Sequence, residues 1–249
     1  MDIVYTIWLR NIKRYLRSKS RIVGSLGMPL FFLLVLGFGL NSVVQIPGAG
    51  QDYMGFIIPG IISMSVLFTS VFSGIQIIWD KQFGFLKETL VAPVSRLEIM
   101  FGQTLGGATT AFIQGFIILV LSLFMGLNLT SVSGFLIASV FMVLIGLSFT
   151  AFGIAIASKM EDMHGFQLIM NFVIFPIFGL SGALFPIDNL PSWLKSLTLL
   201  DPLTYGVEGI RYGLAGTSQV NPFFGFVVLA GFTVFMVVVG AALFRRIEV

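Results

Sequence analysis

Long apolar runs without a charged residue alternate with short charged stretches along the chain. No charged side chain stands between Arg21 and Asp52, and the apolar part of this run covers residues 22–40. Further uncharged runs cover residues 53–79 and 99–158. A helix rises about 1.5 Å per residue, so roughly 20 residues cross a hydrocarbon core of about 30 Å. The first two runs therefore fit one membrane span each, and the third is too long for a single span.

A cluster of Gly, Asn, Ser and Thr residues at 126–134 divides the third run. Such residues favour turns, so this run predicts two spans, at 99–125 and 135–157. Two more apolar stretches, at 166–185 and 223–244, complete a set of six. The predicted fold class is an all-α polytopic membrane protein with six transmembrane helices in one domain.

The composition agrees with a lipid environment. Hydrophobic residues make up 57% of the 249 positions and charged residues 10%, whereas soluble domains carry roughly 25% charged residues. A soluble protein of this composition would expose large apolar patches. The chain also has no cysteine, which excludes a disulfide framework and a thiolate metal site.

Basic residues are distributed unevenly between the predicted loops. Twelve of the fourteen Lys and Arg residues fall in the two termini or in the loops after the second and fourth spans. Lys195 and Arg211 are the two exceptions. Because cytoplasmic loops carry the excess of Lys and Arg, both termini are expected in the cytoplasm, with the chain in the cell membrane.

The N-terminal segment 1–21 has the pattern of an amphipathic helix. Polar positions on one face are Thr6, Arg10, Lys13 and Arg17, and apolar positions on the other are Val4, Ile7, Trp8, Ile12 and Tyr15. A basic amphipathic helix with aromatic residues at its boundary is typical of the membrane interface. The candidate interfacial residues are Trp8, Arg10, Lys13, Arg14 and Arg17. The alternative is a charged flank that only sets the orientation of the first span.

Residues 80–98, between the second and third spans, mix charges with apolar side chains. The apolar positions are Phe83, Phe85, Leu86, Leu90 and Val91, and Pro93 would end a short helix. A fully solvated loop does not need this much apolar surface. An amphipathic helix between two spans is well placed to dock on a soluble partner, and the alternative is a helix lying on lipid.

Residues 186–217, between the fifth and sixth spans, are of mixed polarity and contain two helix-start signals. Asn189 stands two residues before Pro191, and Asp201 stands directly before Pro202. A capping side chain followed by Pro in the first turn is typical of a helix N-terminus. We therefore expect two short helices, which form a re-entrant pair if protein shields their backbone.

The sequence itself shows no source of energy for transport. It contains no G-x-x-x-x-G-K-[ST] motif, so this chain is not expected to bind ATP as P-loop proteins do. The predicted spans hold no charged residue, although ion-coupled carriers usually place ionisable groups there. Their neutral polar residues include Ser63, Ser65, Thr69, Ser73, Gln76, Gln103, Thr104, Gln114 and Asn171. A secondary carrier or channel without an ATPase is therefore the weaker alternative.

Three small motifs have competing interpretations. The residues Gly179 to Gly182 resemble the Gly-x-Ser-Gly of intramembrane proteases, but His164 lies seventeen residues from Ser181, or about 25 Å along a helix. Helix packing by small residues is the favoured interpretation there, and also for the two G-x-x-x-G matches, with dimerisation as the alternative. Those matches are Gly102 with Gly106 and Gly209 with Gly213. Glu161, Asp162 and His164 match no firm metal pattern, so no metal site is predicted.

Taken together, these features resemble the ABC-2 type permeases, the membrane subunits of ABC exporters, over essentially the whole chain, 1–249. The similarity is carried by the basic interfacial helix, by segment 80–102 and, most specifically, by the stretch from Ser181 to Gly216. Distinctive positions in these parts are Gly84, Leu90, Pro93, Ser95, Arg96, Ala183, Phe185, Pro186, Leu190, Pro191, Pro202, Leu203, Tyr205 and Arg211. Within the family, the chain most resembles the drug-exporter branch, which is similar to daunorubicin-resistance permeases.

The resemblance implies a role for each marked segment. The ATPase-coupling helix would comprise Phe85, Leu86, Lys87, Glu88, Val91, Pro93 and Arg96. The extracellular re-entrant pair would include Pro186, Pro191, Pro202, Tyr205, Glu208 and Arg211. Ser63, Phe68, Thr69, Gln76, Asn171 and Phe172 are the candidates for lining a pathway formed mainly by spans one, two and five.

The resemblance also implies partners. It points to a second permease copy or paralogue, two copies of an ABC ATPase that binds ATP and Mg²⁺, and the surrounding lipids, with no cofactor in this chain and no nucleic acid. The expected function is a permease subunit of an exporter for a hydrophobic drug, lipid or glycolipid, not an enzyme. The carrier or channel and, remotely, the intramembrane serine protease remain as alternatives.

Overall fold

The computed structural model describes residues 2–39, 53–85, 94–127, 131–245 and 247, and within these ranges the regular secondary structure is entirely helical. The first helices are α1 (Asp2–Arg17), α2 (Lys19–Phe32) with its π-helical continuation η1 (Leu33–Phe38), α4 (Tyr53–Ser73) and α5 (Ile75–Gln82). They are followed by α7 (Arg96–Phe124), α8 (Val132–Ala157) and α9 (Met163–Leu180). The last part contains η2 (Ile187–Asn189), α10 (Ser192–Leu200), α11 (Pro202–Ala215) and α12 (Pro222–Phe244).

The described residues contain six helices that are long and apolar enough to cross a membrane. Their bounds are Lys19–Phe38, Tyr53–Gln82, Arg96–Phe124, Val132–Ala157, Met163–Leu180 and Pro222–Phe244. The predicted six-span, all-helical fold is therefore confirmed. Several spans extend a few residues beyond the uncharged runs, because Lys19, Arg21, Asp80 and Arg96 lie at helix ends, where charged side chains remain near the interface.

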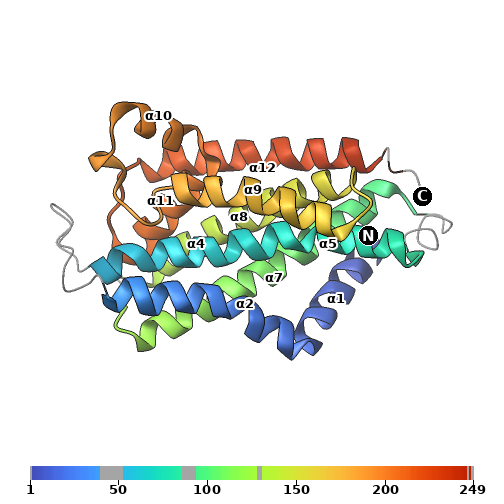
Figure 1. Cartoon of the computed structure of the whole chain (residues 1–249), viewed down its shortest axis with the longest axis horizontal. Helices are drawn as coiled ribbons and strands as arrows, with labels where there is room; N and C mark the ends of the chain where they lie inside the picture. Colours follow the sequence, from blue (N-terminus) through green and yellow to red (C-terminus); the bar gives the residue numbers. More distant parts are fainter. Residues whose placement is uncertain (1, 40–52, 86–93, 128–130, 246, 248–249) are drawn as a thin grey trace.

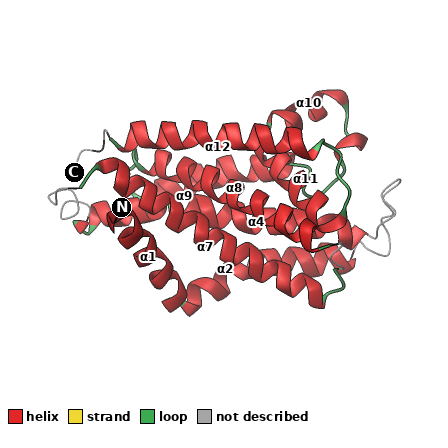
Figure 2. Ribbon diagram, turned by 180° about the vertical axis from the view of Figure 1, so that it is seen from behind, coloured by secondary structure: helices red, strands yellow, loops and turns green. Residues whose placement is uncertain are grey.

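The long helices lie side by side along the long axis of the molecule, as Figures 1 and 2 show. The N-terminal and C-terminal regions lie at the same end, as an even number of spans requires, and α10 and α11 lie at the opposite end (Figure 1). The fully buried side chains come mainly from α4, α7, α8 and α11. In contrast, α2, α9 and α12 expose much of their apolar surface, so they form the outside of the bundle.

Helix α11 packs against α8 at glycine positions. A Cβ on Gly213 would lie 2.5 Å from the carbonyl oxygen of Gly134, and a Cβ on Gly209 would lie 2.3 Å from the Phe141 ring. These distances leave no room for a side chain, so the two backbones approach directly. Within this chain the motif of Gly209 and Gly213 therefore serves helix packing, as expected for small residues in membrane proteins.

Helix α1 packs against α7 in the same manner. A Cβ on Gly102 would lie 2.8 Å from the Ile7 Cβ, and a Cβ on Gly106 would lie 2.5 Å from the Asn11 side chain. Ile7 and Tyr15 are buried by this contact. The helix predicted for the membrane interface is thus helical and amphipathic as expected, but its apolar face packs on protein because α7 offers a groove of small residues.

The two short helices predicted between the last two spans are present as α10 and α11. Asp201 caps α11, with its Oδ1 accepting a hydrogen bond from the Leu203 amide at 2.9 Å, and Pro202 is the first helical residue. The expectation for Asn189 is wrong. It ends the short η2 helix, and α10 begins three positions beyond it, at Ser192, with Pro191 at the N-cap and no side-chain cap.

We predict that Gly213→Ala lowers the free energy of unfolding by about 1–3 kcal/mol, because the added methyl group overpacks the α8–α11 contact. The change is measured by thermal unfolding of the purified protein in detergent. Gly231→Ala is the matched control, since a Cβ there meets nothing within 4 Å. Equal effects of the two substitutions would show that close backbone approach at Gly213 does not stabilise the bundle.

Candidate functional site

The predicted coupling segment falls largely outside the described residues, which exclude 86–93. Leu86, Lys87, Glu88, Val91 and Pro93 are among the excluded positions, so their assignment stays a prediction. Phe85, the last described residue before this stretch, is 56% exposed.

Arg96 follows the segment at the start of α7. Its Nη1 donates hydrogen bonds to the backbone carbonyls of Arg245 and Ile247. Around it, the N-cap Ser95 and Glu98 of the first turn form a capping box in which each side chain accepts a hydrogen bond from the other residue's backbone amide. The start of α7 is therefore fixed to the C-terminal end of the chain, a contact between residues about 150 positions apart that sequence spacing does not reveal.

Asp80, near the end of α5, is the centre of a polar network at the end of the bundle that holds the termini. Its carboxylate accepts hydrogen bonds from Arg10 Nη2 at 3.0 Å, from Gln76 Nε2 at 2.7 Å and from Gln103 Nε2 at 3.3 Å. Asn11 Nδ2 in turn donates to Gln103 Oε1 at 2.6 Å. These five residues are called the basal network. It joins α1, α5 and α7, and it compensates a carboxylate that is only 6% exposed.

Two further hydrogen bonds hold α1 along α7. Trp8 Nε1 donates to Thr109 Oγ1 at 3.0 Å, and the Tyr15 hydroxyl donates to Gln114 Oε1. Burial raises the pKa of the Tyr15 phenol, so it remains a neutral donor near pH 7. Of the residues predicted for the membrane interface, Trp8 and Arg10 therefore contact protein.

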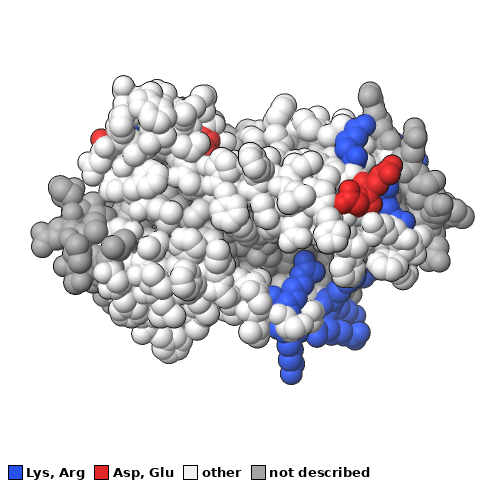
Figure 3. Space-filling model, viewed as in Figure 1, with Lys and Arg blue, Asp and Glu red and all other residues white. Residues whose placement is uncertain are grey.

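The remaining interfacial candidates, Lys13, Arg14 and Arg17, are exposed. The Arg14 guanidinium lies 5.5 Å from the centroid of the Trp79 ring. Lys and Arg side chains gather around this end of the molecule in Figure 3, as expected for a surface beside lipid headgroups.

Glu208 and Arg211 form a buried ion pair at the opposite end of the bundle. The Arg211 Nη1 donates to Glu208 Oε1, and its Nη2 donates to the Gly182 carbonyl at 3.0 Å. The same guanidinium lies 4.0 Å from the centroid of the Phe56 ring. The second carboxylate oxygen of Glu208 accepts from the Gln219 amide at 2.5 Å. These residues, the outer network, join α11 to α4 and to the loops after α9 and α11.

The other residues predicted for the re-entrant pair lie at helix starts or connect α10 with α11. The Tyr205 hydroxyl donates to the Leu199 carbonyl at 2.7 Å and so ties α11 to α10. Pro186 and Pro191 precede η2 and α10, and Pro202 begins α11. Together with the outer network, these contacts fix the short helices against the spans.

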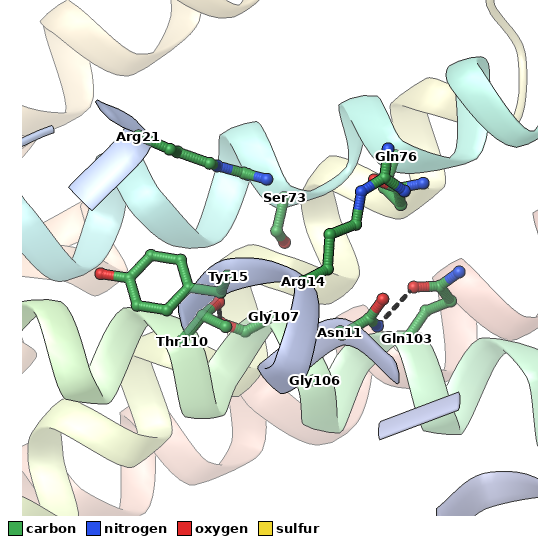
Figure 4. A pocket seen from close by; sticks show the side chains of 10 residues that line it. All are labelled: Asn11, Arg14, Tyr15, Arg21, Ser73, Gln76, Gln103, Gly106, Gly107 and Thr110. Carbon is green, nitrogen blue, oxygen red and sulfur yellow. Dashed lines mark hydrogen bonds between the residues drawn. The ribbon is translucent and has the colours of Figure 1, made fainter. Parts of the chain in front are cut away.

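A cavity of about 220 Å³ lies between α2 and α4, beside the junction of α1 and α2. Its lining comprises Tyr15, Arg21, Gly24, Ser25, Met28, Pro29, Met64, Ser65, Phe68, Thr69 and Phe72. We call it the apolar cavity. A smaller polar cleft of about 30 Å³ adjoins it, shares Tyr15 and Arg21 with it, and also contains Gln76 (Figure 4).

The residues predicted to line a pathway divide into two groups. Phe68 and Thr69 line the apolar cavity, and Gln76 lines the polar cleft. Ser63 is fully buried, and its hydroxyl donates to the Pro59 carbonyl of its own helix at 2.8 Å. Asn171 and Phe172 lie on α9 outside both hollows, and Phe172 is 87% exposed.

The pairing required for an intramembrane serine protease is not formed. His164 lies in the first turn of α9, and Ser181 directly follows the end of this helix, so about 25 Å of helix separates them. Ser181 is buried and donates to the Phe178 carbonyl at 2.7 Å. Asp162, two positions before His164, caps α9 by accepting a hydrogen bond from the Gly165 backbone amide.

Comparison with known proteins gives a consistent assignment. The family model described as ABC-2 type transporter matches residues 3–215. A putative transport permease, ycf38 of Cyanophora paradoxa, is 30% identical over 79% of this chain and 68% of its own length. The inner membrane transport permease YadH of Escherichia coli K12 is 26% identical over 97% and 94% of the two chains. Nodulation protein J of Rhizobium leguminosarum is 27% identical over 96% of this chain and 93% of its own length.

For the outer network, we predict that Glu208→Gln lowers the free energy of unfolding by about 3–5 kcal/mol, because Arg211 keeps a buried charge without its counter-ion. Thermal unfolding in detergent measures the loss. Asp188→Asn breaks the exposed pair with Lys195 and is expected to cost less than about 1 kcal/mol.

A double variant, Glu208→Leu with Arg211→Met, should recover part of the loss, since no charge is then buried. A Glu208→Gln variant as stable as Asp188→Asn would contradict the assigned role of the buried pair.

Proposed function

Because the chain belongs to the ABC-2 type transporter family, we propose that it forms half of the transport pathway of an ATP-driven exporter. The family makes it a membrane permease of an ABC transporter, and its six apolar helices make it a multi-pass membrane protein. In this proposal a second permease, identical or paralogous, completes the pathway. Two copies of a separate ATPase subunit bind ATP and Mg²⁺, and this chain binds no cofactor and carries out no ATP hydrolysis.

The observation that carries the proposed coupling is the basal network on both sides of segment 86–93. In the sequence this segment connects α5 to α7. Asp80 of α5 accepts hydrogen bonds from Gln103 of α7 and from Arg10 of α1. A partner that moves the segment therefore also moves α1.

Movement of α1 reaches the first span through a short elbow. Ser18, with φ −92° and ψ 76°, separates α1 from α2. The two helices point in different directions from Ser18 onward (Figure 1), so a shift of α1 changes the position of α2 relative to α4. In the proposed cycle, ATP binding closes the ATPase pair, and this chain of contacts opens the pathway outward.

Large apolar side chains exposed on the outer surfaces of α2 and α9 support the proposed pathway and the second permease that would complete it. In the single chain Val23 and Phe31 of α2 are 69% and 57% exposed, and Leu168 and Phe172 of α9 are 70% and 87% exposed. Behind this surface, Phe68 contacts the rings of Phe175 and Phe178, and Phe32 contacts Phe178. Such an apolar, aromatic lining suits a hydrophobic drug, a lipid or a glycolipid.

The proposed orientation places the basic end of the bundle and both termini in the cytoplasm of a cell whose plasma membrane holds the protein. The basic residues around α1 support it, since Lys and Arg collect on the cytoplasmic side of membrane proteins. The same orientation puts segment 86–93 on the ATP side and α10 and α11 outside.

We predict that the tagged chain, purified gently from its native membrane, brings with it a stoichiometric soluble protein containing G-x-x-x-x-G-K-[ST]. Replacing Leu86 and Val91 by Asp should abolish this association, because charge replaces the apolar docking surface. Leu200→Asp is the matched control, since Leu200 is 79% exposed on α10 at the other end of the bundle.

Two results would count against this prediction. If the complex persists in the Leu86→Asp and Val91→Asp double variant, the coupling segment is wrongly assigned. Recovery of the permease alone in several mild detergents, together with transport that does not need ATP in vesicles, would favour the carrier or channel.

The absence of cysteine provides a background for testing orientation. We predict that Ser196→Cys and Thr217→Cys react with a membrane-impermeant maleimide added to intact cells, whereas Ser20→Cys and Lys159→Cys react only after lysis. All four positions are exposed in the structure, so the membrane, and not the protein, decides whether the reagent reaches the new cysteine. Labelling of Ser20→Cys or Lys159→Cys in intact cells would reverse the proposed orientation.

A further inference from the structure

Three hollows at the α1–α2 elbow are joined by shared residues. The outermost is an open basic surface depression of about 800 Å³, which we call the basic vestibule. Its lining comprises Arg10, Lys13, Arg14, Arg17, Ser18, Lys19 and Ser20. It shares Arg14 with the polar cleft, and the cleft shares Tyr15 and Arg21 with the apolar cavity. The three neighbouring hollows therefore change in character from basic through polar to apolar.

Two guanidinium groups face the polar cleft, and its lining contains no acidic residue. Figure 4 shows Arg21 extending from α2 toward Ser73 and Arg14 extending from α1 toward Gln76. The nearest carboxylate of the basal network, Asp80, already accepts hydrogen bonds from three side chains. Within the described residues, neither Arg14 nor Arg21 forms an ion pair. The contact of Arg14 with the Trp79 ring leaves its charge without a counter-ion, so both charges can attract an anion.

The apolar cavity has the opposite character. Met28, Met64, Phe68 and Phe72 line it with large apolar side chains. Met28 is also 50% exposed, so the cavity lies at the surface of the single chain and not deep in its core.

One buried polar group in this cavity has no partner. Ser65 lines the cavity, is 2% exposed, and its hydroxyl forms no hydrogen bond. The other described serines of the same helix, Ser63, Ser70 and Ser73, all donate to carbonyls of their own helix. A buried hydroxyl without a partner is costly, which sets Ser65 apart from the other described serines of α4.

We propose that the polar cleft and the apolar cavity together bind an acidic amphiphile. Its phosphate or carboxylate head lies between Arg14 and Arg21, which form charge-assisted hydrogen bonds with such oxygens. Its hydrocarbon chain lies along Met28, Phe68 and Phe72, whose apolar side chains match it in character. A small inorganic anion leaves the apolar cavity unused, and a neutral hydrocarbon leaves the two guanidinium groups unused, so the pair of hollows fits a molecule with both parts.

Both a transported molecule and a resident phospholipid have this chemistry. The binding site rests on contacts within this chain and does not depend on the proposed ATP-driven export. Its test is therefore separated into a binding arm without an ATPase and a transport arm with one.

The binding arm uses the purified full chain in nanodiscs of phosphatidylcholine. The probe is palmitic acid with a photoreactive diazirine in its chain, and the comparison probe is its uncharged methyl ester. After illumination, mass spectrometry locates the label. We predict that the acid labels α2 and α4 in preference to the ester, and that Arg21→Gln lowers this preference about fivefold, as the loss of roughly 1 kcal/mol of attraction implies.

Two control variants accompany Arg21→Gln. Arg21→Lys keeps the positive charge and should keep the preference for the acid. Lys159→Gln removes one positive charge from the exposed connection between α8 and α9, outside all three hollows, and should also leave the preference unchanged. Since Arg21 and Lys159 are both exposed, neither change is expected to unfold the chain.

The outcomes are distinct. Loss of acid preference in Arg21→Gln, with its retention in both controls, supports the site. Equal preference in all variants, or label spread over α9 and α12 with no dependence on Arg21, overturns it.

In the transport arm, inverted vesicles hold the complex with its ATPase and the same acid probe. ATP-dependent uptake that Arg21→Gln abolishes identifies the occupant as cargo, whereas label that ATP leaves in place identifies a resident lipid, and the site stands in either case.

Discussion

A polar group inside a hydrocarbon environment must find its hydrogen-bond partner within the protein, because lipid chains supply none. In this chain the constraint is most evident at Asp80, a carboxylate that three helices surround. Its donors come from α1, α5 and α7, so satisfying one buried charge fixes the relative positions of three elements. Glu208 and Arg211 have the same effect at the other end, where their contacts join α11 to α4 and to two loops. The bundle is thus fastened at both ends by compensated charges.

Between these two networks the helices are held by close contact. Apolar side chains gain little by leaving lipid for protein, so association in membranes depends on packing and on the few polar bonds available. The glycines at the α8–α11 and α1–α7 contacts provide this packing, since the missing side chains bring the backbones together. Small residues and polar networks therefore have complementary roles. The glycines permit the close approach, and the hydrogen bonds select the register in which it occurs.

This arrangement gives the proposed function a physical route. The segment predicted to meet the ATPase connects two helices that the basal network ties to α1, and α1 continues through Ser18 into the first span. The polar cleft and the apolar cavity lie directly beside this elbow. A movement that tilts α1 would therefore change the shape of the proposed binding site, so that coupling and substrate handling share one set of contacts. The outer network, in contrast, holds the opposite end of α4 and α11 in place.

The sequence by itself determined the number of spans, the placement of both termini at one end and the presence of two short helices, α10 and α11, before the last span. These features follow from local signals: the length of an uncharged run, a cluster of turn residues, and an Asp–Pro pair that caps a helix. The tertiary structure alone decided that α1 packs on α7, that Asp80 pairs with Arg10 and that Arg96 holds the C-terminal end. These partners are separated by 70 to 151 positions. A polar side chain indicates that it needs a partner but not which one, because the partner is selected by how the helices pack in three dimensions.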